Sequence, residues 1–252
     1  MALQIIVLQN YLARRHLRYE RVFRDRTCPL EIYDDVDLYR RCCFTRQGIE
    51  YLIGLLSDDI SPPTLRSYSI PASLQVFIAL RYLSTGSMQL TISDTVSVSQ
   101  SSVSRIVRRF VRFLCSRLTR YIYMPTDEEL PTIKRKFYQI SRFPNVMATI
   151  DGTHIRILAP SEHKEVYVNR KGFHSLNVMV VMDANYIIRY VASQWPGSTH
   201  DSRELQMSRL WGQLNNNPNR GVILGDSGYP NRNFLLTPLP ASNTEPQGQY
   251  NR

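Results

Sequence analysis

Apolar and polar positions alternate in blocks along the second half of the chain. Four apolar runs have the length and β-branched content typical of buried strands: 146–157, 176–182, 187–195 and 221–226. The segment 198–214 lies between the last two runs and has the spacing of a helix, with Leu205, Leu210 and Leu214 on one face. The order strand, strand, strand, helix, strand predicts an α/β domain.

The connections between these runs predict how the strands pair. Three consecutive strands joined by short turns form an antiparallel meander, whereas a helix before the fourth strand lets that strand return parallel to the first. Asp151 lies in the first run and Asp226 ends the fourth, so we expect both at one edge of the sheet. This is the layout of an RNase H-like mixed sheet, in which carboxylates of adjacent strands hold divalent metal for phosphodiester chemistry.

The first half of the chain has helical patterns instead. Residues 1–26 read as an arginine-rich amphipathic helix and 28–43 as a link, and helical spacing follows at 45–56 and 74–83. We therefore expect an all-α domain over 1–125, a linker with an entry helix over 126–145, and the α/β core over 146–252.

The segment 89–118 predicts a short helix, a tight turn and a longer helix. The longer helix is either an ordinary amphipathic helix or the second helix of a helix-turn-helix unit that lies on DNA. If the segment is a helix-turn-helix unit, two sets of polar residues of the longer helix would contact different parts of the DNA. Those near base edges would be Gln100, Ser101, Ser102 and Ser104, and those that meet phosphates would be Arg105, Arg108, Arg109 and Arg112.

Composition and charge narrow the partner class. The 252 residues are 43% apolar, enough for a core, and the net charge of +10 with a pI of about 9.6 favours a partner rich in phosphates. The four cysteines lack metal-ligand spacing, and we expect free thiols. No apolar run approaches the length of a membrane span.

Asp151 is the first candidate site residue. It lies in an apolar run, where an ionised carboxylate is costly unless it is paired or holds a cation. It is therefore an ion-pair partner, a turn residue or a metal ligand. Asp201, at the start of the helical segment, either favours the helix N-terminus electrostatically or faces a metal.

Four motifs in order resemble the Harbinger/PIF superfamily of DDE transposases, and most closely its domesticated Harbinger transposase-derived nucleases. They are IDGTHI (150–155), RKGFHSLN (170–177), PGSTHDSR (196–203) and GDSGYP (225–230). The resemblance implies Asp151, Asp201 and Asp226 as catalytic metal ligands, with Mg²⁺ or Mn²⁺ as the cofactor. It also implies DNA as the substrate and a separate Myb-like DNA-binding partner protein.

Several residues beside the motifs have open roles. His154 and His200 either orient carboxylates, contact the scissile phosphate, or are structural. Arg170, Lys171 and Arg203 either neutralise phosphate or form surface salt bridges.

The sequence departs from the family in one respect. The family's third acid is a glutamate on a helix beyond the GDSGYP strand, and this chain ends at Arg252, where that segment would begin. Glu245 lies in a loop before Pro246 and is not assigned that role, so we expect a C-terminally truncated core. We expect a metal-dependent nuclease without transposition activity, in the nucleus and cytoplasm. The alternative is a non-catalytic DNA- or protein-binding module of transposase descent.

Overall fold

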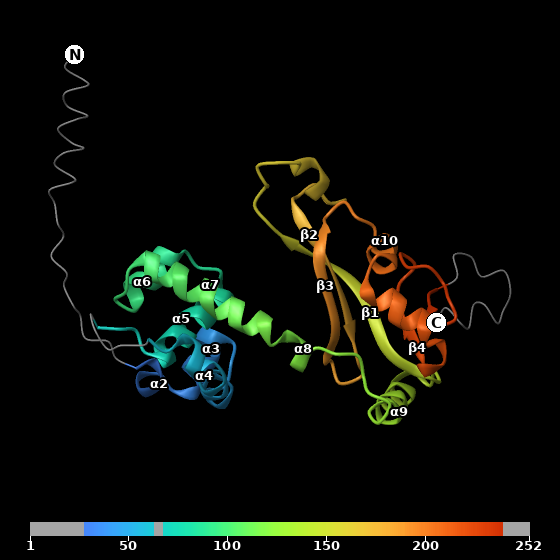
Figure 1. The fold of residues 1–252 in the computed structure, drawn as a ribbon, viewed down its shortest axis with the longest axis horizontal. Coiled ribbons are helices and arrows are strands. Elements are labelled where there is room, and N and C mark those ends of the chain that lie inside the picture. The colour runs from blue at the N-terminus through green and yellow to red at the C-terminus, as the bar shows by residue number, and fades with distance from the viewer. Residues whose placement is uncertain (1–27, 63–67, 239–252) are drawn as a thin grey trace, which may run out of the picture. The chain divides into compact units, whose positions relative to one another are not determined.

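The structure is a computed structural model that describes residues 28–62 and 68–238. The chain divides into two compact units, residues 1–117 and 118–252 (Figure 1). The helix expected over 1–26 lies outside the described residues. The division precedes the expected domain end at 125, and the two residues before that position which contact the second unit are Tyr123 and Met124. Met124 contacts the core of the second unit, and Tyr123 lies 5.5 Å from the guanidinium of Arg189.

The described part of the first unit is built from helices alone. They are α2 (Pro29–Ile32), α3 (Asp35–Cys42), α4 (Arg46–Ile60), α5 (Ala72–Thr85), α6 (Gln89–Thr95) and α7 (Gln100–Ser116). Helix α5 is the centre of this unit, since every residue from Leu74 to Leu80 is buried. It ends at Gly86, whose φ of 62° is a left-handed conformation that glycine adopts at low cost.

Two helices in this unit correct the sequence analysis. Residues 28–43 were expected to be a link, yet they contain α2 and α3. The Asp34 side chain accepts a hydrogen bond from the Asp37 amide and so caps α3, which buries Leu38 and Cys42 one turn apart. The acidic cluster that suggested a link is therefore a helix start.

Helices α6 and α7 occupy the predicted helix-turn-helix segment. Ser99 caps α7 by accepting a hydrogen bond from the Ser102 amide at 3.2 Å. Helix α7 buries Val103, Ile106 and Phe110 against the helical core. The predicted short helix, turn and longer helix are therefore present, and the longer helix begins at Gln100.

The second unit contains a mixed sheet with helices around it. Its helices are α8 (Leu118–Tyr121), α9 (Leu130–Ser141), α10 (Asp201–Gln206) and α11 (Arg209–Asn216), with 3-10 turns η1 (Lys164–Tyr167) and η2 (Pro218–Arg220). Its strands are β1 (Val146–Arg156), β2 (Ser175–Met182), β3 (Ile188–Pro196), β4 (Val222–Leu224) and β5 (Leu235–Leu236). The strand order is β3-β2-β1-β4-β5.

The pairing of the strands is that of an RNase H-like sheet, as predicted. Strands β1 and β2 are antiparallel, as are β2 and β3, whereas β4 runs parallel to β1 and β5 parallel to β4. The register places Thr149 of β1 opposite Leu224 of β4. The fourth strand therefore returns beside the first after the helical crossover.

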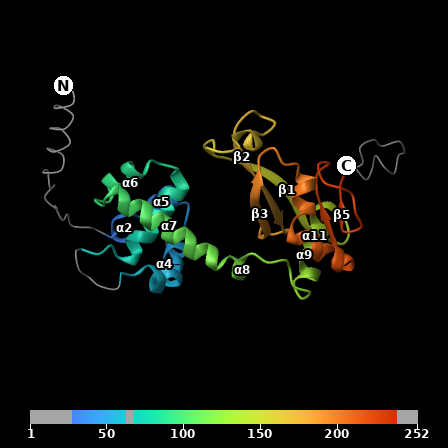
Figure 2. The same ribbon diagram turned by 45° about the horizontal axis from the view of Figure 1, so that its top comes forward.

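Helices lie against the sheet of the second unit (Figures 1 and 2), and two apolar clusters hold them there. Helices α10 and α11 contribute Leu205, Leu210 and Leu214 to a cluster that includes Met179 and Ile223 of the strands. Helix α9 contributes Ile133 and Phe137 to a second cluster, with Val146, Val222 and Leu224. Because Ile223 alternates with Val222 and Leu224 along β4, the two clusters lie on opposite faces of the sheet.

The segment 198–214 was expected to form one helix, but it forms two. Helix α10 ends at Gln206, and Ser208 then starts α11 by accepting a hydrogen bond from the Trp211 amide at 3.3 Å. A serine in the middle of an apolar helical pattern therefore marks a second helix start.

Two further expectations concern the whole chain. All four cysteines, Cys28, Cys42, Cys43 and Cys115, carry free thiols. Within residues 28–62 and 68–238, no helix has the length and apolar content needed to cross a membrane.

Candidate active site

Asp151 and Asp226 lie at corresponding positions on neighbouring strands. Thr149 pairs with Leu224, and each aspartate comes two residues later in its own strand direction. Asp151 is exposed, and one of its carboxylate oxygens accepts a hydrogen bond from the Gly152 amide at 2.8 Å. Asp226 is also exposed and accepts from the Gly228 amide at 2.9 Å, which closes the turn after β4. Both carboxylates are therefore open to a ligand from solvent.

Asp201 reaches the same edge from α10. Its Oδ1 accepts a hydrogen bond of 2.7 Å from Nδ2 of Asn177 on β2. The same Nδ2 donates to the Thr199 carbonyl at 3.1 Å, and Asn177 is only 1% exposed. The Asp201 carboxylate is therefore directed at the sheet by a buried partner, in addition to lying at a helix start.

Two glycines make room for this carboxylate. A Cβ on Gly152 would lie 2.5 Å from Asp201 Oδ1, closer than real Cβ contacts come. A Cβ on Gly228 would lie 3.3 Å from Asp201 Oδ2 and 3.0 Å from Asp226 Oδ1. The carboxylates of Asp201 and Asp226 thus converge on one point, beside the strand that carries Asp151.

Glu204 is a fourth acid near this edge that the sequence analysis missed. It is fully buried, and its Oε1 accepts a hydrogen bond from the Met179 amide at 3.2 Å. Met179 lies where the β2–β3 register shifts. Burial, opposed in part by this hydrogen bond and aided by the charge of Asp201, raises the pKa of Glu204 to about 7.

Tyr229 lies among the four acids. Burial is the main cause that raises the pKa of its hydroxyl above the usual range. Four carboxylates add to the rise through their negative charge, in the order Asp201, Glu204, Asp151 and Asp226. The Tyr229 hydroxyl, Glu204 Oε2 and Asn177 Oδ1 are buried atoms without a hydrogen-bond partner among the described residues. This edge of the sheet therefore combines crowded negative charge with unsatisfied polar atoms.

His154 belongs to a chain of hydrogen bonds that fixes the orientation of its ring. Asn169 Nδ2 donates to Ser175 Oγ at 3.0 Å, and Ser175 Oγ is hydrogen-bonded to His154 Nδ1 at 3.2 Å. Ser175 is fully buried and Asn169 is 5% exposed. The His154 ring is therefore held at Nδ1 by a buried partner.

The other auxiliary candidates are at the surface. His200 precedes α10 and is exposed, as are Arg170, Lys171 and Arg203. None of these residues takes part in the ion pairs found within the described segments. The alternative of a surface salt bridge therefore has no support for the three cations, and they remain available to an anion.

The donor set fits a hard divalent cation, although the side chains are not closed around one. Within the described ranges, no three His, Cys, Asp or Glu side chains are arranged to hold a metal ion together. Asp151, Asp201, Glu204 and Asp226 nevertheless form no ion pair with any described basic residue. Carboxylate oxygens are the ligands that Mg²⁺ and Mn²⁺ prefer, and a cation would relieve their mutual repulsion.

The polar residues of α7 form the second candidate site, in the first unit. Gln100, Ser101 and the arginines of this helix are exposed, whereas Ser102 and Ser104 are half-buried. The Ser99 hydroxyl lies 3.0 Å from that of Ser101 and 2.9 Å from that of Ser102. Two of the four polar residues expected at base edges are thus engaged in the helix cap. The exposed arginines share one face: Arg105, Arg108, Arg109 and Arg112.

Comparison with known proteins finds similarity to proteins described as nucleases. The family described as DDE superfamily endonuclease matches residues 150–252. "Putative nuclease HARBI1" of Mus musculus is 39% identical over 211 residues, which are 83% of this chain and 60% of that protein. The Homo sapiens protein of the same name is 38% identical over 210 residues. "Protein ALP1-like" of Arabidopsis thaliana is 30% identical over 230 residues, 82% of this chain and 56% of that protein.

This chain thus spans about 60% of the length of the HARBI1 proteins that it matches. Among solved structures, a chain of "Crystal structure of a pre-cleavage Mos1 transpososome" is 14% identical, with a TM-score of 0.22. The match covers 96% of this chain and 69% of that one.

Proposed function

We propose that this homologue of the HARBI1 proteins, whose residues 150–252 match the DDE superfamily endonuclease family, is a metal-dependent nuclease that hydrolyses DNA phosphodiester bonds. We propose hydrolysis without transposition. The reaction of the whole protein is part of the proposal, whereas the family match concerns residues 150–252 alone.

One observation carries the proposal. Asp151, Asp201 and Asp226 come from β1, α10 and the end of β4, three separate elements, yet they lie around one edge of the sheet and form no ion pair with a described basic residue. Carboxylates gathered in this way repel one another, and a bound cation would offset that repulsion. These three aspartates are the residues that would hold divalent metal, and metal bound there would stabilise charge on the phosphate and activate water.

The surrounding residues orient and assist the aspartates. Asn177 fixes the direction of the Asp201 carboxylate, and Gly152 and Gly228 leave it space. Ser175 holds the His154 ring at Nδ1, which leaves Nε2 as the ring nitrogen that would contact a phosphate. The cations of Arg170, Lys171 and Arg203 form no ion pair within the described segments and suit backbone phosphates.

Helix α7 supports DNA as the partner in this proposal. Its buried face is committed to the helical core, while four arginines on its exposed face meet no acidic residue in the described ion pairs. Arginine suits phosphate because its planar group donates in pairs. DNA binding by this helix would not depend on which phosphodiester bond is cut.

The test is nicking of supercoiled plasmid by the purified chain with Mg²⁺ or Mn²⁺. Asp151→Asn and Asp226→Asn should abolish nicking and weaken Mn²⁺ binding measured by calorimetry. Glu128→Gln removes one negative charge from an exposed acid of the same unit and should leave both properties unchanged. Nicking that survives both aspartate changes would disprove the site assignment.

The second candidate is a non-catalytic DNA- or protein-binding module of transposase descent. One observation favours it, since no three acids within the described segments are arranged to hold a metal ion. In that case the wild-type chain binds the plasmid DNA but does not nick it with Mg²⁺ or Mn²⁺, and Asp151→Asn leaves DNA binding unchanged.

A further inference from the structure

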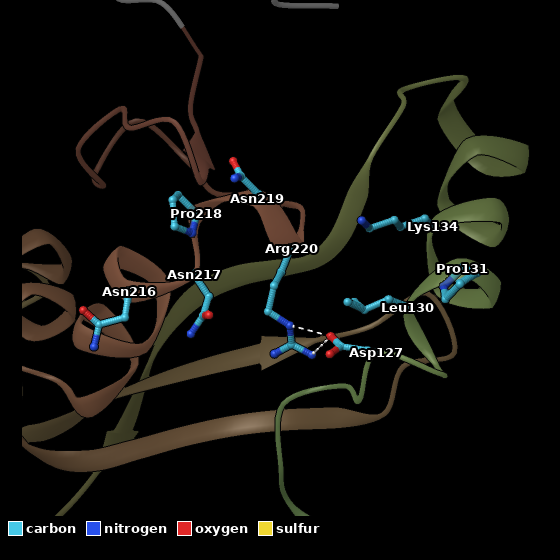
Figure 3. A pocket seen from close by; sticks show the side chains of 9 residues that line it. All are labelled: Asp127, Leu130, Pro131, Lys134, Asn216, Asn217, Pro218, Asn219 and Arg220. Atoms are coloured by element: carbon cyan, nitrogen blue, oxygen red, sulfur yellow. Dashed lines mark hydrogen bonds and ion pairs between the residues drawn. The ribbon is translucent and has the colours of Figure 1, made fainter.

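A hollow of about 640 Å³ lies on the second unit, away from the carboxylates (Figure 3). It is formed by the start of α9 on one side and by the segment from α11 to β4 on the other. Its polar lining consists of Asp127, Lys134, Asn216, Asn217, Asn219 and Arg220. The hollow lies beside the beginning of β4, whereas Asp226 follows its end, so the two sites are at opposite ends of this strand.

Two lining residues, Asp127 and Arg220, form an ion pair and neutralise each other. Arg220 Nε donates to Asp127 Oδ1 at 2.9 Å, and Arg220 Nη2 donates to the Pro125 carbonyl at 2.6 Å. In Figure 3 the guanidinium faces Asp127. The only acid in the lining is therefore already satisfied, and the hollow does not suit a cation.

Lys134 gives the hollow its net positive charge. Its stem passes over Gly221, where an added Cβ would lie 3.0 Å from Lys134 Cε. In Figure 3 its ammonium end extends from α9 toward the loop that carries Asn219. No ion pair of the described residues includes Lys134. A glycine thus lets a half-buried lysine place an unpaired charge in this space.

The chemistry of the lining selects an oxyanion. The amides of Asn216, Asn217 and Asn219 add hydrogen-bond donors to the lining opposite Lys134, and one of them, Asn217 Nδ2, donates to the Gln213 carbonyl at 3.5 Å. No aromatic ring is available for stacking on a base, since the apolar part of the lining is Leu130, Pro131 and Pro218. A group with several acceptor oxygens and negative charge fits best. We propose that this hollow binds a phosphate group and that the DNA backbone is its source.

Only the source of the phosphate rests on the proposed function. From Gly221 to Asp226 the extended chain covers roughly 16 Å. At a rise of about 3.4 Å per base pair, a duplex that occupies both sites must extend about five base pairs from the cutting site. The hollow would then hold flanking DNA and contribute to position rather than to chemistry.

The experiment compares Lys134→Gln with Arg135→Gln in the full chain. Arg135 is the next residue of α9, is exposed, and does not line the hollow, so the pair loses equal charge. Inorganic phosphate is titrated and followed by the backbone amide NMR signals of Asn216, Asn217, Asn219 and Arg220. Binding to 30- and 10-base-pair duplexes is then measured by fluorescence anisotropy from 0.05 to 0.3 M NaCl.

Lys134→Gln should remove the phosphate-induced shifts. It should also weaken binding of the 30-base-pair duplex roughly fivefold to tenfold at 0.1 M salt, with a salt slope smaller by about 1. Arg135→Gln should keep the shifts and weaken binding less. Asn219→Ala, at an exposed position, should also reduce the shifts, which guards against misfolding of the lysine variant.

Equal weakening by the two variants, or phosphate shifts that survive Lys134→Gln, would overturn the proposal. Loss of the shifts with unchanged duplex binding would overturn DNA as the source. Nicking does not enter these readouts, and Asp151→Asn should bind phosphate as wild type does, so failure of the nuclease proposal is detected separately.

Discussion

The side-chain amide of Asn177 holds the carboxylate of Asp201 at 2.7 Å, although the two residues belong to β2 and α10. Asn177 is buried, and its Oδ1 lies 3.4 Å from the place where a Gly152 Cβ would be. The hydrogen bond, the strand glycine and the acid therefore form one packed unit. The direction of the Asp201 carboxylate depends on space as well as on its partner.

Gly152→Ala should displace Asp201 without unfolding the sheet. The added Cβ would lie 2.5 Å from Asp201 Oδ1, so the carboxylate must move. Because residues that orient ligands affect metal affinity about tenfold to a hundredfold, we expect Mn²⁺ affinity measured by calorimetry to fall by at least about tenfold. Gly212→Ala, with nothing within 4 Å, is the control and should leave affinity unchanged. Unaltered Mn²⁺ binding by Gly152→Ala would contradict a role for Asp201.

Glu204 should make stability depend on pH. Its pKa of about 7 in the folded chain lies above the ordinary value of 4.5, so the folded state holds the proton more tightly. Its contribution is fully present below about pH 4.5 and is lost as pH rises through 7. The loss should reach up to about 3 kcal/mol. Glu204→Gln keeps an acceptor for the Met179 amide and should lack this dependence.

Urea unfolding with EDTA, at pH values from 4.5 to 8, measures that difference. Tryptophan fluorescence reports the second unit selectively, because both tryptophans, Trp195 and Trp211, lie in it. Parallel pH profiles of wild type and Glu204→Gln would show that Glu204 is not the responsible group.

Arg189→Met should destabilise the second unit strongly. Arg189 is 5% exposed and joins Asp183 at 2.8 Å and Glu129 at 3.0 Å, and the Asp183 side chain is fully buried. Loss of the arginine leaves a buried charge without its partner, which costs about 3–5 kcal/mol. Asp127→Asn breaks the exposed pair with Arg220 and should cost less than about 1 kcal/mol. Urea unfolding followed by tryptophan fluorescence compares the two, and equal costs would refute the argument.

Changing Arg108 and Arg109 together to glutamine should weaken DNA binding and reduce its salt slope by about 2, since each would meet one phosphate. Arg40→Gln removes an exposed charge from α3 of the same unit and should have a smaller effect. Fluorescence anisotropy across a NaCl series gives both slopes. If Arg40→Gln changes the salt slope as much per lost charge as the double variant does, DNA is attracted by the overall positive charge, and α7 is not the specific contact.

Much of the sheet could be predicted because its apolar runs are separated by clear turns. Adjacent positions for Asp151 and Asp226 followed from a helical crossover that returns β4 parallel to β1. Strand β5 has only two residues, Leu235 and Leu236, and has no pattern of its own. It forms because β4 offers it a parallel edge.

Glu204 shows why part of the site could not be predicted. An acid in a short amphipathic helix is ordinarily on the solvent face, and no local pattern separates a buried one. Its partner is the Met179 amide, 25 residues away, at a shift in strand register that the sequence does not mark. Its spacing of three residues from Asp201 was the available signal, since positions i and i+3 share a helix face.

The lack of a side chain at position 152 also has an evolutionary consequence. Position 152 and position 201 occupy one volume, so neither can change size alone without loss of fit. Among homologous sequences the two positions should therefore covary. A residue larger than glycine at 152 should be accompanied by one shorter than aspartate at 201, and such lineages should lack the proposed nuclease activity.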